Sequence, residues 1–297
     1  MGTRMTRRTG LFAAAAALLQ GCSATRALDA LVPSDTYRGR MDIAYGSVAR
    51  QRLDAYLPLR SDAPVPLAVF FYGGSWTRGE RAGYRFVGEA LAARGIATLV
   101  ADYRLSPQVG WREILQDCAQ ATRWAFDNAQ SLGADARRIH VFGHSAGAYN
   151  AAMLALDARW LGAQGLSPRA LAGWVGIAGP YDFLPIRDPE TQVAFGWPGT
   201  PPDSQPLVHA SAEAPRTLLL AAQNDTVVSP QRSTVALARR LEALGVPVRM
   251  RLLERLNHAT ALGVLATPLQ WMAPVHGEVV GFLSAQPGAA PPADPAR

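Results

Sequence analysis

The sequence contains no lysine, only two cysteines and only five histidines, and each shortage narrows the function classes open to it. All 29 basic residues are arginines, and they are scattered without a run of five or more. Chains that bind nucleic acid gather basic residues into a stripe that follows the phosphates, so nucleic acid is not an expected partner. Three arginines precede residue 22 with no acidic residue among them, so the formal charge of +6 falls to +3 for the remainder.

Clusters of metal ligands are also missing. Cysteine and histidine do not recur at ligand spacing, and no Gly-rich phosphate loop is present, so the sequence predicts neither a metal nor an organic cofactor. The two cysteines are Cys22 and Cys118. Cys118 lies in an apolar helical pattern and is expected to be a small core residue. If Cys22 is modified, no intrachain disulfide can form.

Long hydrophobic runs are absent too. The uninterrupted apolar run at residues 11–19 is too short to span a bilayer, and it follows three arginines, which is the layout of an export signal. Leu19-Gln20-Gly21-Cys22 resembles the lipobox of bacterial lipoproteins, in which cleavage precedes a cysteine that is then acylated. We therefore expect a lipoprotein signal peptide at 1–21 and a lipid anchor at Cys22, with acyl chains such as palmitate. The alternative is a buried amino-terminal helix with an incidental cysteine.

The resemblance to lipoproteins also implies a location. Ser23, rather than Asp, follows the cysteine, and this resembles the pattern of outer-membrane lipoproteins. The expected place is the bacterial cell envelope, on the periplasmic face of the outer membrane, with the membrane as a partner through the lipid anchor.

The remaining composition indicates one large folded domain. Hydrophobic residues make up 49% of the 297 and charged residues 18%, so a sizeable core is expected. Most of the expected strands are continuous apolar runs, as buried parallel strands are. They cover residues 41–45, 51–57, 64–72, 96–102, 139–142, 170–177, 217–222 and 246–253, and helical patterns cover 82–94, 111–132, 230–244 and 273–283.

This alternation predicts an α/β fold with a mostly parallel eight-stranded sheet and helices on both faces. We expect a tether over 22–38, a catalytic domain over 39–285 and a disordered tail over 286–297. A Pro-rich, aromatic-rich stretch at 180–215 interrupts the alternation after the carboxyl end of a strand. Loops of this length are usually functional or disordered, so we predict a cap-like insertion over the site. The alternative is a surface excursion unrelated to ligand.

The sequence Gly143-His144-Ser145-Ala146-Gly147 matches the G-x-S-x-G nucleophile elbow. An apolar strand is expected before it and an Ala-rich helix after it, which is the context that the motif requires. Ser145 is therefore the predicted nucleophile, and the N–H of Ala146 is a predicted oxyanion donor. The alternative is a Gly-rich turn between a strand and a helix.

A serine hydroxyl needs a base, and the base needs an acid to orient it. His258 lies in a polar loop beyond the last expected strand, where the order Ser…Asp…His places the base on this kind of sheet. Asp225 follows the buried strand at 217–222 and is the predicted acid. Asp182 and Glu254 stay open as alternatives.

Five motifs then occur in order: Gly-Gly-Ser-Trp (73–76), Asp-Tyr-Arg-Leu-Ser-Pro (102–107), Gly-His-Ser-Ala-Gly (143–147), Asn-Asp-Thr-Val-Val (224–228) and Asn-His-Ala (257–259). Together they resemble the α/β-hydrolase esterase/lipase family, in the branch of hormone-sensitive-lipase-like carboxylesterases, bacterial feruloyl esterases and kynurenine formamidases. The resemblance covers roughly residues 40–285. It implies the α/β-hydrolase fold, the triad Ser145–His258–Asp225, and oxyanion N–H groups from Gly74, Ser75 and Ala146.

The resemblance implies a serine carboxylesterase that cleaves a small-molecule ester through an acyl-enzyme. An arylformamidase or other amide hydrolase with the same triad is the alternative, and a non-catalytic envelope lipoprotein is the rival from another class. Trp76 is predicted to bind substrate as part of an apolar pocket. The family usually has His where this chain has Tyr72, and a tyrosine hydroxyl is expected to anchor the loop instead. The oligomeric state is left open.

Overall fold

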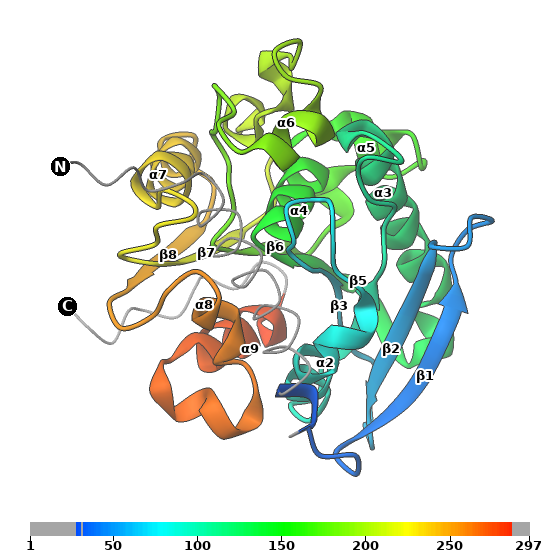
Figure 1. Ribbon diagram of the computed structural model, residues 1–297. Helices are drawn as coiled ribbons and strands as arrows, with labels where there is room; N and C mark the ends of the chain where they lie inside the picture. The colour runs from blue at the N-terminus through cyan, green and yellow to red at the C-terminus, as the bar shows by residue number, and fades with distance from the viewer. Residues whose placement is uncertain (1–27, 31, 287–297) are drawn as a thin grey trace, which may run out of the picture.

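A computed structural model describes residues 28–30 and 32–286. In this part of the chain eight strands form one sheet in the order β1-β2-β4-β3-β5-β6-β7-β8 (Figure 1). The strands are β1 (Tyr37–Ala44), β2 (Arg52–Pro58), β3 (Val65–Phe71), β4 (Ala97–Ala101), β5 (Ala134–His144), β6 (Gly173–Ile177), β7 (Thr217–Ala222) and β8 (Val248–Leu253). The pairs β1–β2 and β2–β4 are antiparallel, and all other neighbours in the sheet are parallel. The predicted mostly parallel sheet is confirmed.

Helices cover both faces of the sheet. They are α2 (Arg85–Ala92), α3 (Trp111–Asn128), α4 (Ala146–Leu156), α5 (Ala158–Gly162), α6 (Pro189–Phe195), α7 (Ala236–Ala243), α8 (Thr260–Gly263) and α9 (Val275–Ser284). Helices α2 and α9 lie side by side, since Nε2 of His276 contacts the carbonyl of Ala90 at 3.1 Å. Helices α3, α4 and α5 lie together away from α2 and α9 (Figure 1).

The core sits where the central strands meet α4. All seven residues of β3 are buried, as are the last six of β5. Helix α4 is buried around its whole circumference, and its run of alanines lets it fit between the sheet and its neighbours. Cys118 of α3 is fully buried, as the sequence predicts.

The amino-terminal segment of the described chain contacts this core. Leu28 and Val32 pack against it, and the N–H of Phe86 donates to a carboxylate oxygen of Asp29 at 3.0 Å. This segment belongs to the region predicted as a tether. The predicted signal peptide, Cys22 and residues 287–297 of the predicted tail lie outside the described residues. No helix of the described ranges combines the length and the apolarity needed to span a bilayer.

Candidate active site

Ser145 sits on a sharp corner between β5 and α4. Its backbone has φ 54° and ψ −122°, a conformation that non-glycine residues rarely adopt and that the elbow requires. The Ser145 N–H donates to the carbonyl of Ile177 at 2.9 Å, which fixes the corner to the end of β6. A methyl group on Gly147 would overlap the carbonyl of Phe71, and one on Gly143 would overlap the carbonyl of Gly147. Both glycines of the motif are therefore required by close backbone approach.

The structure brings the three predicted triad side chains together. Ser145 Oγ lies 2.9 Å from Nε2 of His258, and Nδ1 of His258 lies 2.7 Å from a carboxylate oxygen of Asp225. The Asp225 side chain is fully buried and the His258 side chain is 15% exposed. A carboxylate can only accept, so Nδ1 carries the proton and Nε2 is left free to accept from Ser145. This tautomer is the one a general base needs.

Asp225 is held in its ionised form. Burial raises the pKa of its carboxyl group, but the hydrogen bond from His258 and the N–H groups of Val228 and Val227 outweigh burial, so the pKa lies below its usual value of 3.8. The two N–H groups donate to the second carboxylate oxygen at 3.0 and 2.8 Å.

The other predicted acids lie elsewhere. Asp182 pairs with Arg232 at 2.9 Å, and Glu254 is exposed. The structure therefore favours Asp225 among the three. Within the described ranges, no three His, Cys, Asp or Glu side chains converge to hold a metal ion.

The loop after β3 lies against the nucleophile. A methyl group built on Gly73 would stand 2.9 Å from Cβ of Ser145. Gly74 has φ 129° and Ser75 has φ 50°, so the chain turns in a region that favours glycine. Ala146 is the first residue of α4, where a backbone N–H has no acceptor within the helix. In the described part of the chain no acceptor takes the N–H of Gly74 or Ser75 either, so all three predicted oxyanion donors are free.

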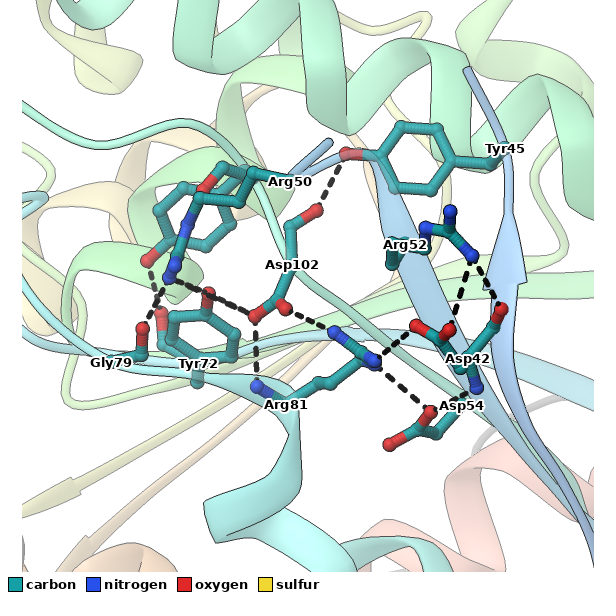
Figure 2. A network of polar contacts seen from close by, with 10 residues as sticks. Asp42, Tyr45, Arg50, Arg52, Asp54, Tyr72, Gly79, Arg81 and Asp102 are labelled. Carbon is teal, nitrogen blue, oxygen red and sulfur yellow. Dashed lines mark hydrogen bonds and ion pairs between the residues drawn. The ribbon is translucent and has the colours of Figure 1, made fainter. Parts of the chain in front are cut away.

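A polar network fixes that loop to the rest of the sheet, and Figure 2 shows it around Asp102. The Tyr72 hydroxyl donates to a carboxylate oxygen of Asp102 at 2.6 Å and accepts from Arg50 at 3.0 Å. Arg50 also donates to the carbonyl of Gly79 at the far end of the loop. The Tyr72 ring is fully buried and stacks between the rings of Tyr84 and Tyr103. The predicted replacement of the family histidine by a tyrosine anchor is thus seen in the contacts.

Arg81 extends the network to the β1–β2 hairpin. Its guanidinium contacts Asp42, Asp54 and Asp102 at 2.6, 2.9 and 2.6 Å (Figure 2). Burial lowers the pKa of Arg81, but hydrogen bonds to Asp102 and Asp54 outweigh it and raise the pKa above the ordinary value. Arg81 therefore stays charged and neutralises carboxylates from three segments.

His144 has a role that the sequence reasoning missed. Its Nε2 lies 2.9 Å from the carbonyl oxygen of His258, and the residue is only 8% exposed. Burial and the neighbouring His258 lower the pKa of His144 to about 3, so the ring is neutral and donates from Nε2. His144 thus holds the backbone of His258. The sequence feature that could have indicated this role is the position of His144, directly before Ser145 at the end of a central strand.

Trp76 is buried rather than open to solvent, with 3% of its surface exposed. Its Nε1 donates to Asn150 at 3.0 Å, and its ring packs against Tyr149, Phe183 and Phe195. Trp76 thus forms a wall between α4 and the insertion. Its contact with substrate stays a prediction.

The predicted cap-like insertion packs on this wall. Phe195 of α6 stacks on Trp111 and meets Trp76 edge-on, and α6 lies beside α4 in Figure 1. Glu190 at the start of α6 forms an ion pair with Arg78 and accepts from Thr77 at 3.2 Å. The insertion therefore contacts both the elbow helix and the loop that carries the predicted oxyanion donors.

A family model described as BD-FAE matches residues 53–241, more than half of the chain. The chain belongs to the BD-FAE family. Esterase LipC of Mycobacterium tuberculosis, a relative of this BD-FAE chain, is 30% identical over 230 residues, which are 70% of this chain and 56% of the relative. The isoprenylcysteine α-carbonyl methylesterase of Arabidopsis thaliana is 33% identical over 153 residues, 50% of this chain and 36% of the relative. This chain therefore covers 56% of the length of the first relative and 36% of the length of the second.

Solved structures show the same fold for this BD-FAE member. Esterase B from Lactobacillus rhamnosis matches with a TM-score of 0.71 at 20% identity, over 91% of this chain and 95% of that one. The predicted α/β-hydrolase fold is thereby confirmed. The two relatives and the solved structure described above are named as esterases, and a kynurenine formamidase of Danio rerio is also similar, 28% identical over 146 residues, 49% of this chain and 47% of the relative. His258 lies beyond the segment that the BD-FAE model matches, so its place in the triad rests on the hydrogen bonds.

Proposed function

We propose that this protein is a serine carboxylic-ester hydrolase that acts through an acyl-enzyme. One observation carries the proposal: Asp225, His258 and Ser145 form an unbroken line of hydrogen bonds at the carboxyl ends of the strands. Membership of the BD-FAE family and similarity to relatives named as esterases support the reaction class. The Gly73–Trp76 loop beside the serine supports acyl chemistry, since free N–H groups there can stabilise an oxyanion.

The steps follow from the hydrogen bonds. Ser145 Oγ attacks the carbonyl carbon of the ester while its proton passes to Nε2 of His258, and Asp225 stabilises the imidazolium. The N–H groups of Gly74, Ser75 and Ala146 stabilise the negative oxygen of the tetrahedral intermediate. His258 then protonates the leaving alcohol, which leaves Ser145 acylated. Water attacks the acyl carbon, gives its proton to His258, and the acid is released as Ser145 recovers its proton.

Replacing the serine tests this proposal. Ser145→Ala should lower hydrolysis of p-nitrophenyl butyrate by several orders of magnitude and abolish labelling by a fluorophosphonate probe, while thermal unfolding stays nearly unchanged. Ser131→Ala is the matched control, because Ser131 is exposed and precedes β5, whereas Ser145 follows its opposite end. A folded wild-type protein that neither hydrolyses the ester nor reacts with the probe would favour a non-catalytic envelope lipoprotein.

The same triad could cleave an amide, because an ester and an amide with the same acyl group form the same acyl-enzyme and differ only in the leaving group. Comparing kcat/KM for p-nitrophenyl butyrate and N-formyl-kynurenine separates the two reactions. The ester should react faster. Faster formamide cleavage would reassign the protein as an arylformamidase.

We also propose that the mature protein is anchored to a membrane of the bacterial cell envelope through acylated Cys22, on the periplasmic face of the outer membrane. The basic, apolar and lipobox segments of the sequence support this location. Cys22→Ala should prevent acylation at residue 22, read by mass spectrometry, and should shift the protein out of the outer-membrane fraction. Cys118→Ala is the control. Unchanged outer-membrane fractionation of Cys22→Ala would contradict the anchor.

A further inference from the structure

Residues 256–277, called here the uncharged lobe, contain no Asp, Glu, Lys or Arg. The lobe begins two residues before His258 and carries α8 and a 3₁₀ segment, Thr267–Met272, drawn in orange in Figure 1. Trp271 on this segment is 83% exposed and Met272 is 40% exposed. All seven tryptophans lie in the described part of the chain, and the other six are buried or partly buried. Trp271 and Met272 are neighbours in the sequence, so they form an exposed apolar pair and not a single scattered residue.

The amino-terminal segment is fastened to this lobe through Glu89 of α2. One carboxylate oxygen of Glu89 accepts from Thr36 at 2.9 Å and the other accepts from Thr267 at 2.8 Å. Glu89 is only 2% exposed, so these bonds are shielded from water. Leu28 also lies against α8, with its Cδ1 3.7 Å from a methyl group built on Gly263. The chain therefore enters the folded domain beside the lobe.

This entry point limits how far the lobe can be from a membrane that holds Cys22. Cys22 precedes Leu28 by six residues, which span at most about 20 Å when fully extended. Two exposed arginines flank the lobe. Arg255 directly precedes it in the sequence, and Arg94 lies close enough to His276, near the end of the lobe, to interact with it electrostatically. The carboxylate that follows, Glu278, is 7% exposed and pairs with Arg249 and Arg251. Glu254, exposed beside Arg255, offsets one of these positive charges, so a small positive excess is left that suits anionic lipid headgroups.

We propose that the uncharged lobe is the face that rests on the membrane surface, with Trp271 and Met272 inserted at the headgroup level. Tryptophan favours that depth because its large ring is apolar at one end and polar at the other. The Trp271 N–H donates to the carbonyl of Pro268 at 3.1 Å, so the exposed ring supplies the contact with lipid. This inference builds on the proposed anchor at Cys22. It adds an orientation: the loop that carries His258 continues directly into the membrane-facing segment.

Brominated lipids test the orientation. The full-length protein, purified with its native processing, is bound to vesicles of phosphatidylethanolamine and phosphatidylglycerol whose acyl chains carry bromine, and tryptophan emission is compared with that on unbrominated vesicles. Trp271→Phe should remove at least half of the bromine-dependent quenching. Trp197→Phe, which changes a partly buried tryptophan of the insertion, should leave the quenching in place.

The outcomes separate the lobe from the other proposals. Equal quenching in wild type and Trp271→Phe, or no quenching in either, overturns the membrane-facing lobe. The same holds if Trp271→Gln abolishes a dimer seen by sedimentation, because the lobe then contacts a second copy. Mass spectrometry of the amino-terminal peptide reads acylation of Cys22, and ester hydrolysis reads the triad. Absence of acylation removes the anchor on which the orientation of the lobe rests, whereas loss of ester hydrolysis alone leaves the quenching comparison unaffected.

Discussion

His144 and His258 lie at the same end of the sheet with their rings 5.1 Å apart, yet their surroundings separate their roles. His258 is partly exposed and has a carboxylate on Nδ1, so it can take a proton from Ser145. His144 is buried without a carboxylate, and burial keeps it neutral. It acts on the reaction only through the carbonyl of His258, which makes it a positioning residue.

His144→Phe should therefore lower kcat about five-fold with KM unchanged, since one neutral hydrogen bond contributes about 1 kcal/mol and holds the base in place. His144→Gln keeps an N–H donor at similar reach and should recover most of kcat. Steady-state kinetics on p-nitrophenyl butyrate measure both variants, with thermal unfolding as a check on folding. Equal kcat in the two variants would show that the hydrogen bond does not matter.

At the scale of elements, the active-site loop depends on a hairpin that contributes no residue to the triad. Strands β1 and β2 bring Asp42 and Asp54 to Arg81, and Arg81 in turn holds Asp102 beside Tyr72. The loop between β3 and α2 is thus fixed at both ends. Its N–H groups can face the oxyanion without moving during the reaction, which is how such donors act most strongly.

Tyr72→Phe should lower kcat by about 10-fold or more while KM changes little. Complete loss of a well-placed oxyanion donor costs about 10²–10³ in turnover. Loss of the Tyr72 hydroxyl loosens the loop and so weakens its donors without removing them. Tyr45→Phe is the matched control. The Tyr45 hydroxyl also contacts Asp102, but at its backbone carbonyl (2.5 Å). Both variants should lose about 1–3 kcal/mol of stability, measured by urea unfolding. A kcat loss of the same size in Tyr45→Phe would show that destabilisation alone is responsible.

The same elements show how far sequence reasoning reached. Buried strands of a parallel sheet are continuous apolar runs, so β3, β4 and β7 were predictable, and motif order placed Ser145, Asp225 and His258. The network around Asp102 was not, because it joins side chains from segments far apart in the sequence. The uncharged lobe was also missed, since short helical turns have weak periodicity.

Across the whole molecule, buried histidines link stability to pH, and His140 and His144 have the most strongly lowered pKa values among them. Burial, with the charge of Arg216, lowers the pKa of His140 to about 3, and burial, with His258, does the same for His144. In the unfolded chain both groups have an ordinary pKa of about 6.5 and bind protons below it, so folding stability is complete above that pH and falls as the pH drops toward 3. The slope from each histidine is about 1.4 kcal/mol per pH unit.

His140→Gln should remove one of the two contributions. The free energy of unfolding of wild type and of this variant is measured with urea between pH 4 and 7. The difference between the two should change by about 1.4 kcal/mol per pH unit. Contributions from buried carboxylates, which both proteins share, cancel in this difference. Asn128→Gln, a partly buried site without a titrating group, is the control. A pH-independent difference for His140→Gln would contradict neutral burial of the ring.

The distance along the chain between Ser145 and His258, 113 positions, also has a consequence in time. As the ribosome lengthens the polypeptide, the serine hydroxyl is made long before the imidazole proposed to deprotonate it, and β6, β7 and β8 are made in between. Until residue 258 has been made, the nascent chain holds the predicted nucleophile with no base. The proposed triad therefore cannot form on a nascent chain until the loop after β8, which carries His258, has been made.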